Sequence, residues 1–294
     1  MRYSLRQLEV FVATVQHGSL SAAAKELALS QSAASSALIE LEKQFDMRLF
    51  ERIGKRLVLS ELGRQLHPQA RALLEQARVF EHALGGGRVA GTLAVGATLT
   101  IGNYLAVPMM ADFRAHNPDV EVSLDVANTA TIVAKVANYE LDVGMIEGEL
   151  SHRELDIMPW REDELVVFAA PDHPFAHRKK PPALKQLLAQ NWVLREPGSG
   201  TRQTFERAMH DVLAKLHIAL ELQHTEAIKR AVEAGMGLGC LSQITLKEAF
   251  ARGSLVPVDL PGRDFQRRFS LIVHRKKHRG PLLKQWLTLC EDSV

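Results

Sequence analysis

Apolar residues recur at helical spacing near the start of the chain. One stripe predicts a first helix and is formed by Leu5, Leu8, Phe11, Val12 and Val15. Gly18 is placed to end this helix, because glycine readily adopts the left-handed conformation that closes a last turn. A short, alanine-rich second helix is predicted over residues 22–27, with Ser19 or Ser21 as its N-cap.

A third helix is predicted after the three-residue turn 28–30, with Ser30 as its N-cap. Its predicted buried face consists of Ala34, Leu38, Leu41 and Phe45. Its opposite face begins with Gln31, Ser32, Ser35 and Ser36. Two helices joined by a short turn are typical of a helix-turn-helix, whose second helix meets base edges with its N-terminal residues. The same pattern also fits the solvated face of an ordinary helical domain.

Residues 49–59 read as a short hairpin with a basic tip that contains Arg52, Lys55 and Arg56. Three basic residues in a turn are usually just solvated. Directly after a helix-turn-helix, they instead predict a wing that contacts phosphates or enters a minor groove.

From residue 60 a long amphipathic helix is predicted. Its apolar seam has heptad-like spacing and consists of Leu66, Ala70, Leu73, Ala77, Phe80 and Leu84. This spacing favours a dimerisation helix, with a helix packed on its own domain as the alternative. Pro68 should kink the helix near Arg64, and residues 85–87, all glycine, predict a hinge.

Strands and helices alternate through the rest of the chain. The expected order is strand 93–97, helix 104–116, strand 120–126, helix 131–139 and strand 141–146. A second such unit is expected over about 164–258, and a last strand (269–273) and helix (281–290) return to the first. This order predicts two lobes with parallel sheets covered by helices.

Ligands of such sheets lie beyond the carboxyl ends of strands, against helix N-termini. The candidate ligand-binding residues in loops of this kind are Thr98, Leu99, Thr100, Asn128, Thr129, Ser199, Thr201 and Arg202. Their hydroxyls, backbone amides and guanidinium suit a small anion. Glu147 and Glu226 are expected to fix its orientation or to cap helices. Simple capping is the alternative for each loop taken singly.

Composition narrows the class of protein. The chain has 294 residues with a net charge of +2, which favours two domains and neither demands nor excludes nucleic acid. Two distant cysteines, Cys240 and Cys290, fit buried thiols in a reducing cytoplasm. The start of the chain lacks the apolar core of a signal peptide. The uncharged stretch 93–111 is interrupted by glycine, asparagine and proline, so no membrane segment is predicted.

Enzyme-like fragments are incomplete. A near match to a phosphate-binding loop over 91–98 has Ala97 where lysine is required. The glycines of 235–239 follow a helix and precede an apolar strand, the reverse of a dinucleotide site. Histidine pairs at 173/177 and 274/278 lack further ligands, so no metal site and no catalytic residue are predicted.

The stretch FVATVQHGSLSAAAKELALSQSAASSALIELEKQFDMRLFER resembles the signature of the LysR-type transcriptional regulators. The resemblance implies a multidomain α+β protein: an N-terminal winged helix-turn-helix, a long linker helix and a C-terminal periplasmic-binding-protein-like α/β domain of two lobes. The implied bounds are 1–59, 60–87 and 88–294, with lobe I at about 88–160 plus 266–294 and lobe II at about 161–265. The family often has proline where this chain has Ser32 and a basic residue where it has Ser36.

The resemblance implies a ligand-responsive, DNA-binding regulator without enzymatic activity or cofactor. Its expected partners are a double-stranded DNA operator, a second copy through the linker helix, a homotetramer built from such dimers, and RNA polymerase. The segment TIGNYLAVPMM…NTATIVAKVANYELDVGMIEGEL is similar to a branch that responds to sulfite-like anions, and an organic carboxylate would suit the loops equally well. The alternative is a solute-binding or enzymatic α/β protein with a helical appendage that has no specific affinity for DNA.

Overall fold

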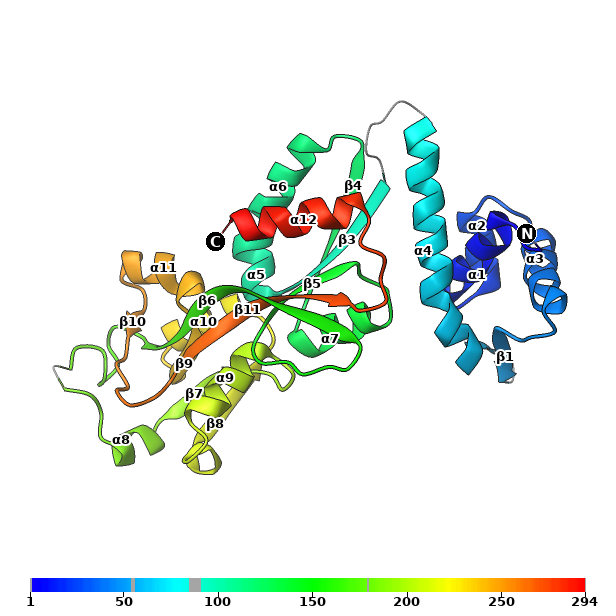
Figure 1. Ribbon diagram of the computed structural model, residues 1–294. Helices are drawn as coiled ribbons and strands as arrows, with labels where there is room; N and C mark the ends of the chain where they lie inside the picture. Colours follow the sequence, from blue (N-terminus) through cyan, green and yellow to red (C-terminus); the bar gives the residue numbers. More distant parts are fainter. Residues whose placement is uncertain (1, 54–55, 85–90, 179, 294) are drawn as a thin grey trace. The chain divides into compact units, whose positions relative to one another are not determined.

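The computed structural model describes residues 2–53, 56–84, 91–178 and 180–293 (Figure 1). Contacts divide the chain into two compact units. The first comprises Met1–Gly91 and Lys276–Lys284, and the second comprises Thr92–Arg275 and Gln285–Val294. The long helix, expected from the sequence as a separate linking segment, groups with the first unit.

The first unit is a small helical domain with a hairpin. Its elements are α1 (Leu5–His17), α2 (Leu20–Glu26), α3 (Gln31–Gln44), β1 (Phe50–Ile53), β2 (Arg56–Leu59) and α4 (Glu61–Leu84). Gly18 ends α1 in the left-handed conformation, and the Ser19 hydroxyl caps α2, as predicted. Phe11 lies in the core, where its ring contacts that of Phe50 edge-on, with centroids 5.8 Å apart.

The prediction for Phe45 was wrong. Ala34, Leu38 and Leu41 are buried on α3, but Phe45 is 38% exposed. The helix ends at Gln44, so Phe45 is its C-cap and leaves the helical periodicity. Its ring instead lies 6.2 Å from that of Tyr3.

Helix α4 divides its apolar residues between two environments. Ala70 and Leu74 are buried in the core of the first unit, whereas Leu73, Phe80 and Leu84 are exposed. The part of α4 that includes Ala70 and Leu74 therefore packs on its own domain, which was the alternative interpretation of this helix. The exposed residues are free to form a dimer seam, which stays a prediction. Pro68 lies inside the helix, and the expected kink stays a prediction. The glycine hinge at 85–87 lies outside the described residues.

The second unit is built on a continuous path of strands. In the described part their order is β4-β3-β5-β11-β6-β9-β7-β8, with β10 paired to β6. The bounds are β3 Gly91–Thr98, β4 Val120–Ala127, β5 Val143–Glu147, β6 Leu155–Ala169, β7 Asn191–Arg195, β8 His217–Leu222, β9 Leu238–Ser242, β10 Val256–Pro257 and β11 Gln266–His274. The β3–β5, β7–β8 and β7–β9 pairs are parallel, as predicted.

Strands β6 and β11 connect two lobes. They pair with each other antiparallel, while β11 also pairs with β5 and β6 with β9. The first lobe contains β3, β4 and β5, and the second contains β7, β8, β9 and β10. In Figure 1 the two connecting strands run from one lobe into the other.

Helices cover both lobes. They are α5 Leu99–Ile101, the π-helix η1 Gly102–Ala106, α6 Val107–His116, α7 Thr129–Ala137, α8 Leu184–Leu188, α9 Gly200–Ala208, the 3-10 helix η2 Leu213–Lys215, α10 Thr225–Glu233, α11 Gln243–Arg252 and α12 Pro281–Asp292. The first helical run starts at Leu99, five residues before the predicted start at Tyr104, and contains a π-helical segment. Trp286 of α12 contacts Phe113 of α6, which returns the last helix to the first lobe.

Candidate functional site

The N-terminal end of α3 carries the polar side chains that the sequence predicts to read DNA. The Ser30 hydroxyl accepts a hydrogen bond from the Ala33 amide (3.1 Å) and lies 3.0 Å from the Ser32 hydroxyl. Gln31, Ser32 and Ser36 are exposed, while Ser35 is half-buried. This surface offers hydrogen-bonding groups but no charge, so it suits reading of base edges better than binding of phosphates.

The β1–β2 hairpin is fixed to the end of α3 by one carboxylate. Oε1 of Glu42 accepts hydrogen bonds from the backbone amides of Leu49 (2.7 Å) and Phe50 (3.2 Å). This contact was missed in the sequence, because it joins a helix to a strand. The predicted wing contacts lie outside the described residues: Lys55 and the side chains of Arg52 and Arg56.

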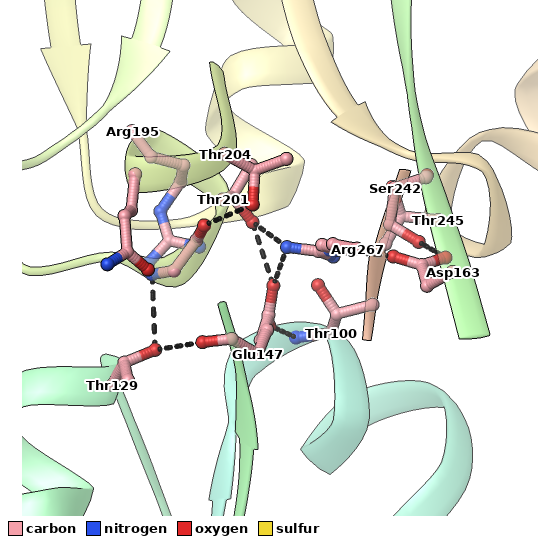
Figure 2. A network of polar contacts seen from close by, with 12 residues as sticks. Thr100, Thr129, Glu147, Asp163, Arg195, Thr201, Thr204, Ser242, Thr245 and Arg267 are labelled. Atoms are coloured by element: carbon pink, nitrogen blue, oxygen red, sulfur yellow. Dashed lines mark hydrogen bonds and ion pairs between the residues drawn. The ribbon is translucent and has the colours of Figure 1, made fainter. Parts of the chain in front are cut away.

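In the second unit, predicted ligand-binding residues of both lobes meet at the carboxylate of Glu147 (Figure 2). Glu147 ends β5 and is 1% exposed. Its Oε1 accepts a hydrogen bond from the Thr100 amide (3.2 Å), and its Oε2 accepts one from the Thr201 hydroxyl (2.8 Å). An ion pair joins it to Arg267. The carboxylate therefore lies where groups of α5, α9 and β11 converge.

A second buried carboxylate holds the other side of Arg267. The Arg267 Nε donates to Oδ2 of Asp163 (2.6 Å), and the Ser242 hydroxyl donates to Oδ1 of Asp163 (2.7 Å). Arg267 Nη1 also donates to the Thr201 hydroxyl oxygen (3.0 Å). One guanidinium thus lies between two carboxylates whose side chains are 1% and 2% exposed.

Glu147 is ionised at neutral pH. Its burial alone would raise the pKa of the carboxyl group, because the charged form loses its hydration. The positive charge of Arg267 and the hydrogen bond from Thr201 outweigh that effect, so the pKa of Glu147 lies below its ordinary value. The site therefore presents a negative charge next to its guanidinium at neutral pH.

Three buried polar atoms on elements that border this network have no hydrogen-bond partner among the described residues: Arg267 Nη2, Thr98 Oγ1 and Thr225 Oγ1. Thr98 ends β3, the neighbour of β5, and Thr225 begins α10. Buried polar groups are nearly always paired in folded proteins. These atoms are accordingly candidates for contact with a bound molecule.

Backbone and side-chain hydrogen bonds hold the two lobes together beside Glu147. Thr129 donates to the backbone oxygen of Glu147 (3.0 Å) and accepts a hydrogen bond from the Gly200 amide (3.1 Å). Asn128 donates through Nδ2 to Oε1 of Glu196 (3.1 Å) and also caps α7. The predicted loops of the two lobes are thus brought together in one place.

A second link between the lobes involves Tyr104 of the π-helical segment. Its hydroxyl donates to Oε1 of Glu226 (3.2 Å), and Glu226 is ion-paired with Lys229. Glu226, predicted to orient a ligand or to cap a helix, is 64% exposed on its side chain and is engaged in this link. The carboxylate at the centre of the network is instead Glu147.

The remaining predicted residues have different environments. Arg202 donates to Glu206 and Glu221 (2.6 Å each), so its guanidinium is engaged within the second lobe. Leu99 is buried as an apolar neighbour of the network. The α9 N-cap residue Ser199 is also buried, and its side chain makes no capping hydrogen bond. The cation paired with Glu147 is Arg267, and a role of Arg202 in ligand binding stays a prediction.

Neither described cysteine suits redox chemistry. Cys240 and Cys290 are free and buried. Burial raises the pKa of both thiols, that of Cys290 to about 12, so the reactive thiolate is scarce at neutral pH. Within the described ranges, no set of three or more His, Cys, Asp or Glu side chains is placed to hold a metal ion. Among the described helices, none is both long and apolar enough to cross a membrane.

Comparisons with known families match almost the whole chain. Residues 5–64 match the model of the bacterial regulatory helix-turn-helix protein, lysR family, and residues 86–294 match the LysR substrate binding domain. The chain belongs to the LysR family of bacterial transcriptional regulators. It is therefore a ligand-responsive transcription regulator with a DNA-binding helix-turn-helix and an effector-binding domain.

Individual proteins agree with this assignment, two over nearly their full lengths and one over its regulatory domain. The chain is 42% identical to the uncharacterized HTH-type transcriptional regulator YeiE of Escherichia coli K12, over 100% of this chain and 99% of that protein. A full-length OxyR variant from Pseudomonas aeruginosa has the same fold, with a TM-score of 0.76 at 22% identity, covering 100% of this chain and 95% of that one. The regulatory domain of CcmR from Synechocystis, in complex with 2-PG, is 30% identical with a TM-score of 0.63, covering 69% and 97%.

The main cation of this LysR effector domain was missed in the sequence. Arg267 is at an alternate position with Phe269 in β11, and both are buried. A charged residue on the apolar face of an alternating strand is a signal that could have identified it. Asp163 and Tyr104 carry no comparable local signal, because their partners lie far away in the sequence.

Proposed function

We propose that this regulator binds a small oxyanion or organic carboxylate at the network around Glu147 and Arg267. The observation that carries the proposal is the buried Arg267 Nη2, which has no partner among the described residues. The equally unpartnered hydroxyls of Thr98 and Thr225 add further hydrogen-bonding groups for such a ligand. Guanidinium and hydroxyl donors are the groups that recognise oxyanions in proteins.

The same proposal includes DNA and protein partners. Residues 30–36 of the first unit and the basic wing would contact a double-stranded operator. The exposed Leu73, Phe80 and Leu84 of α4 fit a homodimer seam, and two such dimers would form a homotetramer. RNA polymerase is a further proposed partner. We place the protein in the cytoplasm and propose that it catalyses no reaction.

Ligand binding would act on DNA through the lobes. A ligand that bonds to Thr98 of the first lobe and to Thr225 of the second favours the arrangement in which the lobes are joined. If that arrangement alters the spacing of DNA-binding domains in the oligomer, the ligand changes the footprint on the operator. An unchanged footprint and affinity at saturating ligand would refute this mechanism.

Oxyanions should stabilise the second unit saturably. We expect sulfite, phosphate or a metabolic carboxylate to raise the thermal midpoint of the full-length protein, because a ligand that binds only the folded state shifts the unfolding equilibrium. Thr201→Val should abolish the shift, since it removes a hydroxyl that joins Glu147 and Arg267. Thr288→Val is the matched control, because Thr288 is exposed on α12. A flat response to the whole panel would remove the oxyanion site and leave the family assignment intact.

Gln31 should contribute to base reading. We expect Gln31→Ala to weaken binding to a selected operator duplex about 5- to 150-fold, the value of one bidentate base contact. Binding to a scrambled duplex should change little, since phosphate contacts dominate it. Fluorescence anisotropy on both duplexes measures the ratio of the dissociation constants for the operator and the scrambled duplex. Gln65→Ala, an exposed change on α4, is the control. Equal losses on both duplexes would show that Gln31 does not read sequence.

A further inference from the structure

The charge balance at the site is unusual for one that receives an anion. Arg267 is the only guanidinium in direct contact with Glu147 and Asp163 among the described residues, so two negative charges face one positive charge. The nearby Arg195, whose positive charge also acts on Glu147, is held on both Nε and Nη2 by the carboxylate of Glu196 (2.8 and 3.0 Å), so it adds no net charge as a pair. A bound anion therefore enters a site that already has an excess negative charge.

We propose that Glu147 selects ligands by protonation: the site takes small oxyanions that keep a proton, such as hydrogen phosphate or hydrogen sulfite, and rejects fully deprotonated ones such as sulfate. This inference rests on the oxyanion site proposed above and specifies its ligand class. It makes Glu147 a specificity-determining residue rather than a helix cap.

Hydrogen-bond chemistry gives the reason. The oxygens of a tetrahedral anion accept from Arg267 Nη2 and from the hydroxyl of Thr98 or Thr225, which are the unpartnered groups. A fully deprotonated anion has only acceptors, so any oxygen near the Glu147 carboxylate is repelled. An anion with one O–H donates that proton to Glu147 in a charge-assisted hydrogen bond.

Glu147 is suited to this role because its position and charge are fixed. The Thr100 amide binds Oε1, and the Thr201 hydroxyl and Arg267 both bind Oε2, which leaves an acceptor position on Oε1 for a further donor. Its lowered pKa keeps it ionised at neutral pH, so it remains an acceptor and cannot donate to a deprotonated anion.

Hydrogen phosphate and sulfate are a matched pair for the test, since they share shape and charge and differ by one proton. Isothermal titration of the full-length protein at constant ionic strength and a mildly alkaline pH, where hydrogen phosphate predominates over dihydrogen phosphate, should show phosphate binding about 10- to 100-fold tighter than sulfate. Glu147→Gln should reduce this ratio to about threefold or less, because the amide both accepts and donates. Glu164→Gln, an exposed change next to Asp163 in β6, should keep the wild-type ratio.

The outcomes separate this inference from the oxyanion site itself. Equal wild-type affinity for phosphate and sulfate would overturn the proposed selection of protonated oxyanions. An equal gain in affinity for both ions in Glu147→Gln would also overturn it, because Glu147 would then only compete with the anion for Arg267. Binding of sulfite or carboxylates without phosphate would also overturn it and leave the oxyanion site standing. No binding of any oxyanion would refute the proposed function and this inference together. The wild-type comparison decides the matter even if the Gln variant fails to fold.

Discussion

Arg267→Met should lower the free energy of unfolding of the second unit by about 3–5 kcal/mol at neutral pH, because breaking a buried ion pair leaves an uncompensated charge. In this variant both Glu147 and Asp163 would stay buried without their guanidinium. Urea unfolding followed by tryptophan fluorescence measures the loss in this unit selectively, since all three tryptophans of the chain lie at positions within it: Trp160, Trp192 and Trp286.

The control for Arg267→Met is its neighbour in β11. Arg268 is 58% exposed and pairs with the 79% exposed Glu162 at 3.4 Å, so Arg268→Met should change stability by no more than about 1 kcal/mol. Equal losses of stability in the two variants would show that the buried ion pairs of Arg267 stabilise the fold no more than the exposed pair of Arg268.

The loss in Arg267→Met should also depend on pH. In the wild type the pKa of Glu147 is lowered, so its contribution to stability is present above the unfolded pKa of about 4.3 and is lost as the pH falls through the folded pKa. In the variant, burial without Arg267 should raise the pKa of the same carboxyl group, and protonation then removes the buried charge. The difference in the free energy of unfolding between the wild type and Arg267→Met should therefore narrow as the pH falls from about 7 to about 5. If this difference stayed constant over the range, the loss of stability in Arg267→Met would not come from buried carboxylates that lack a partner.

Local chemistry made the helical elements of the first unit predictable. The Ser30 cap and the Gly18 terminus depend on residues close in sequence, and each is found in the structure. The predicted alternation of strand 120–126 holds from Val120 to Leu124 and fails at Val126, which is exposed. Strand β6, which runs from Leu155 to Ala169, was not predicted as one strand. It carries Pro159 and a run of charged residues where it passes between the lobes, so its apolar pattern is interrupted there.

The sequence predicted which loops contribute to the site, but it did not predict which charged side chains pair with one another there. Thr100, Glu147 and Thr201 were expected at strand ends and helix starts, and the structure brings them together. The sequence could not show that Arg202 bonds to carboxylates of its own lobe or that Arg267 pairs with Glu147. The contacts of Arg267 depend on register between strands that are more than a hundred residues apart, as in the Arg267–Asp163 pair.

Gly200→Ala should separate the two lobes at the site. A Cβ on Gly200 would lie 2.0 Å from the backbone oxygen of Glu147, where ordinary contact begins at 3.4 Å, so the atoms must part by more than 1 Å. That displacement breaks the hydrogen bond from the Gly200 amide to Thr129 (3.1 Å) and disturbs the adjacent one from Thr201 to Glu147. The obstacle is backbone, so no change of side-chain rotamer can relieve it. We expect a loss of about 1–3 kcal/mol in stability, typical of overpacking, together with loss of the oxyanion response.

Gly235→Ala separates steric conflict from backbone strain. Gly235 has a φ of +79° and no atom within 4 Å of its would-be Cβ, so alanine there is strained but meets nothing. It should cost about 1 kcal/mol and leave oxyanion binding intact, as measured by the same thermal titration. If Gly200→Ala also kept wild-type oxyanion binding, the close approach of α9 to β5 would not be required for the site. If Gly200→Ala lost oxyanion binding and Gly235→Ala kept it, the site would require a residue without a Cβ at position 200, where the second lobe brings Thr201 to Glu147.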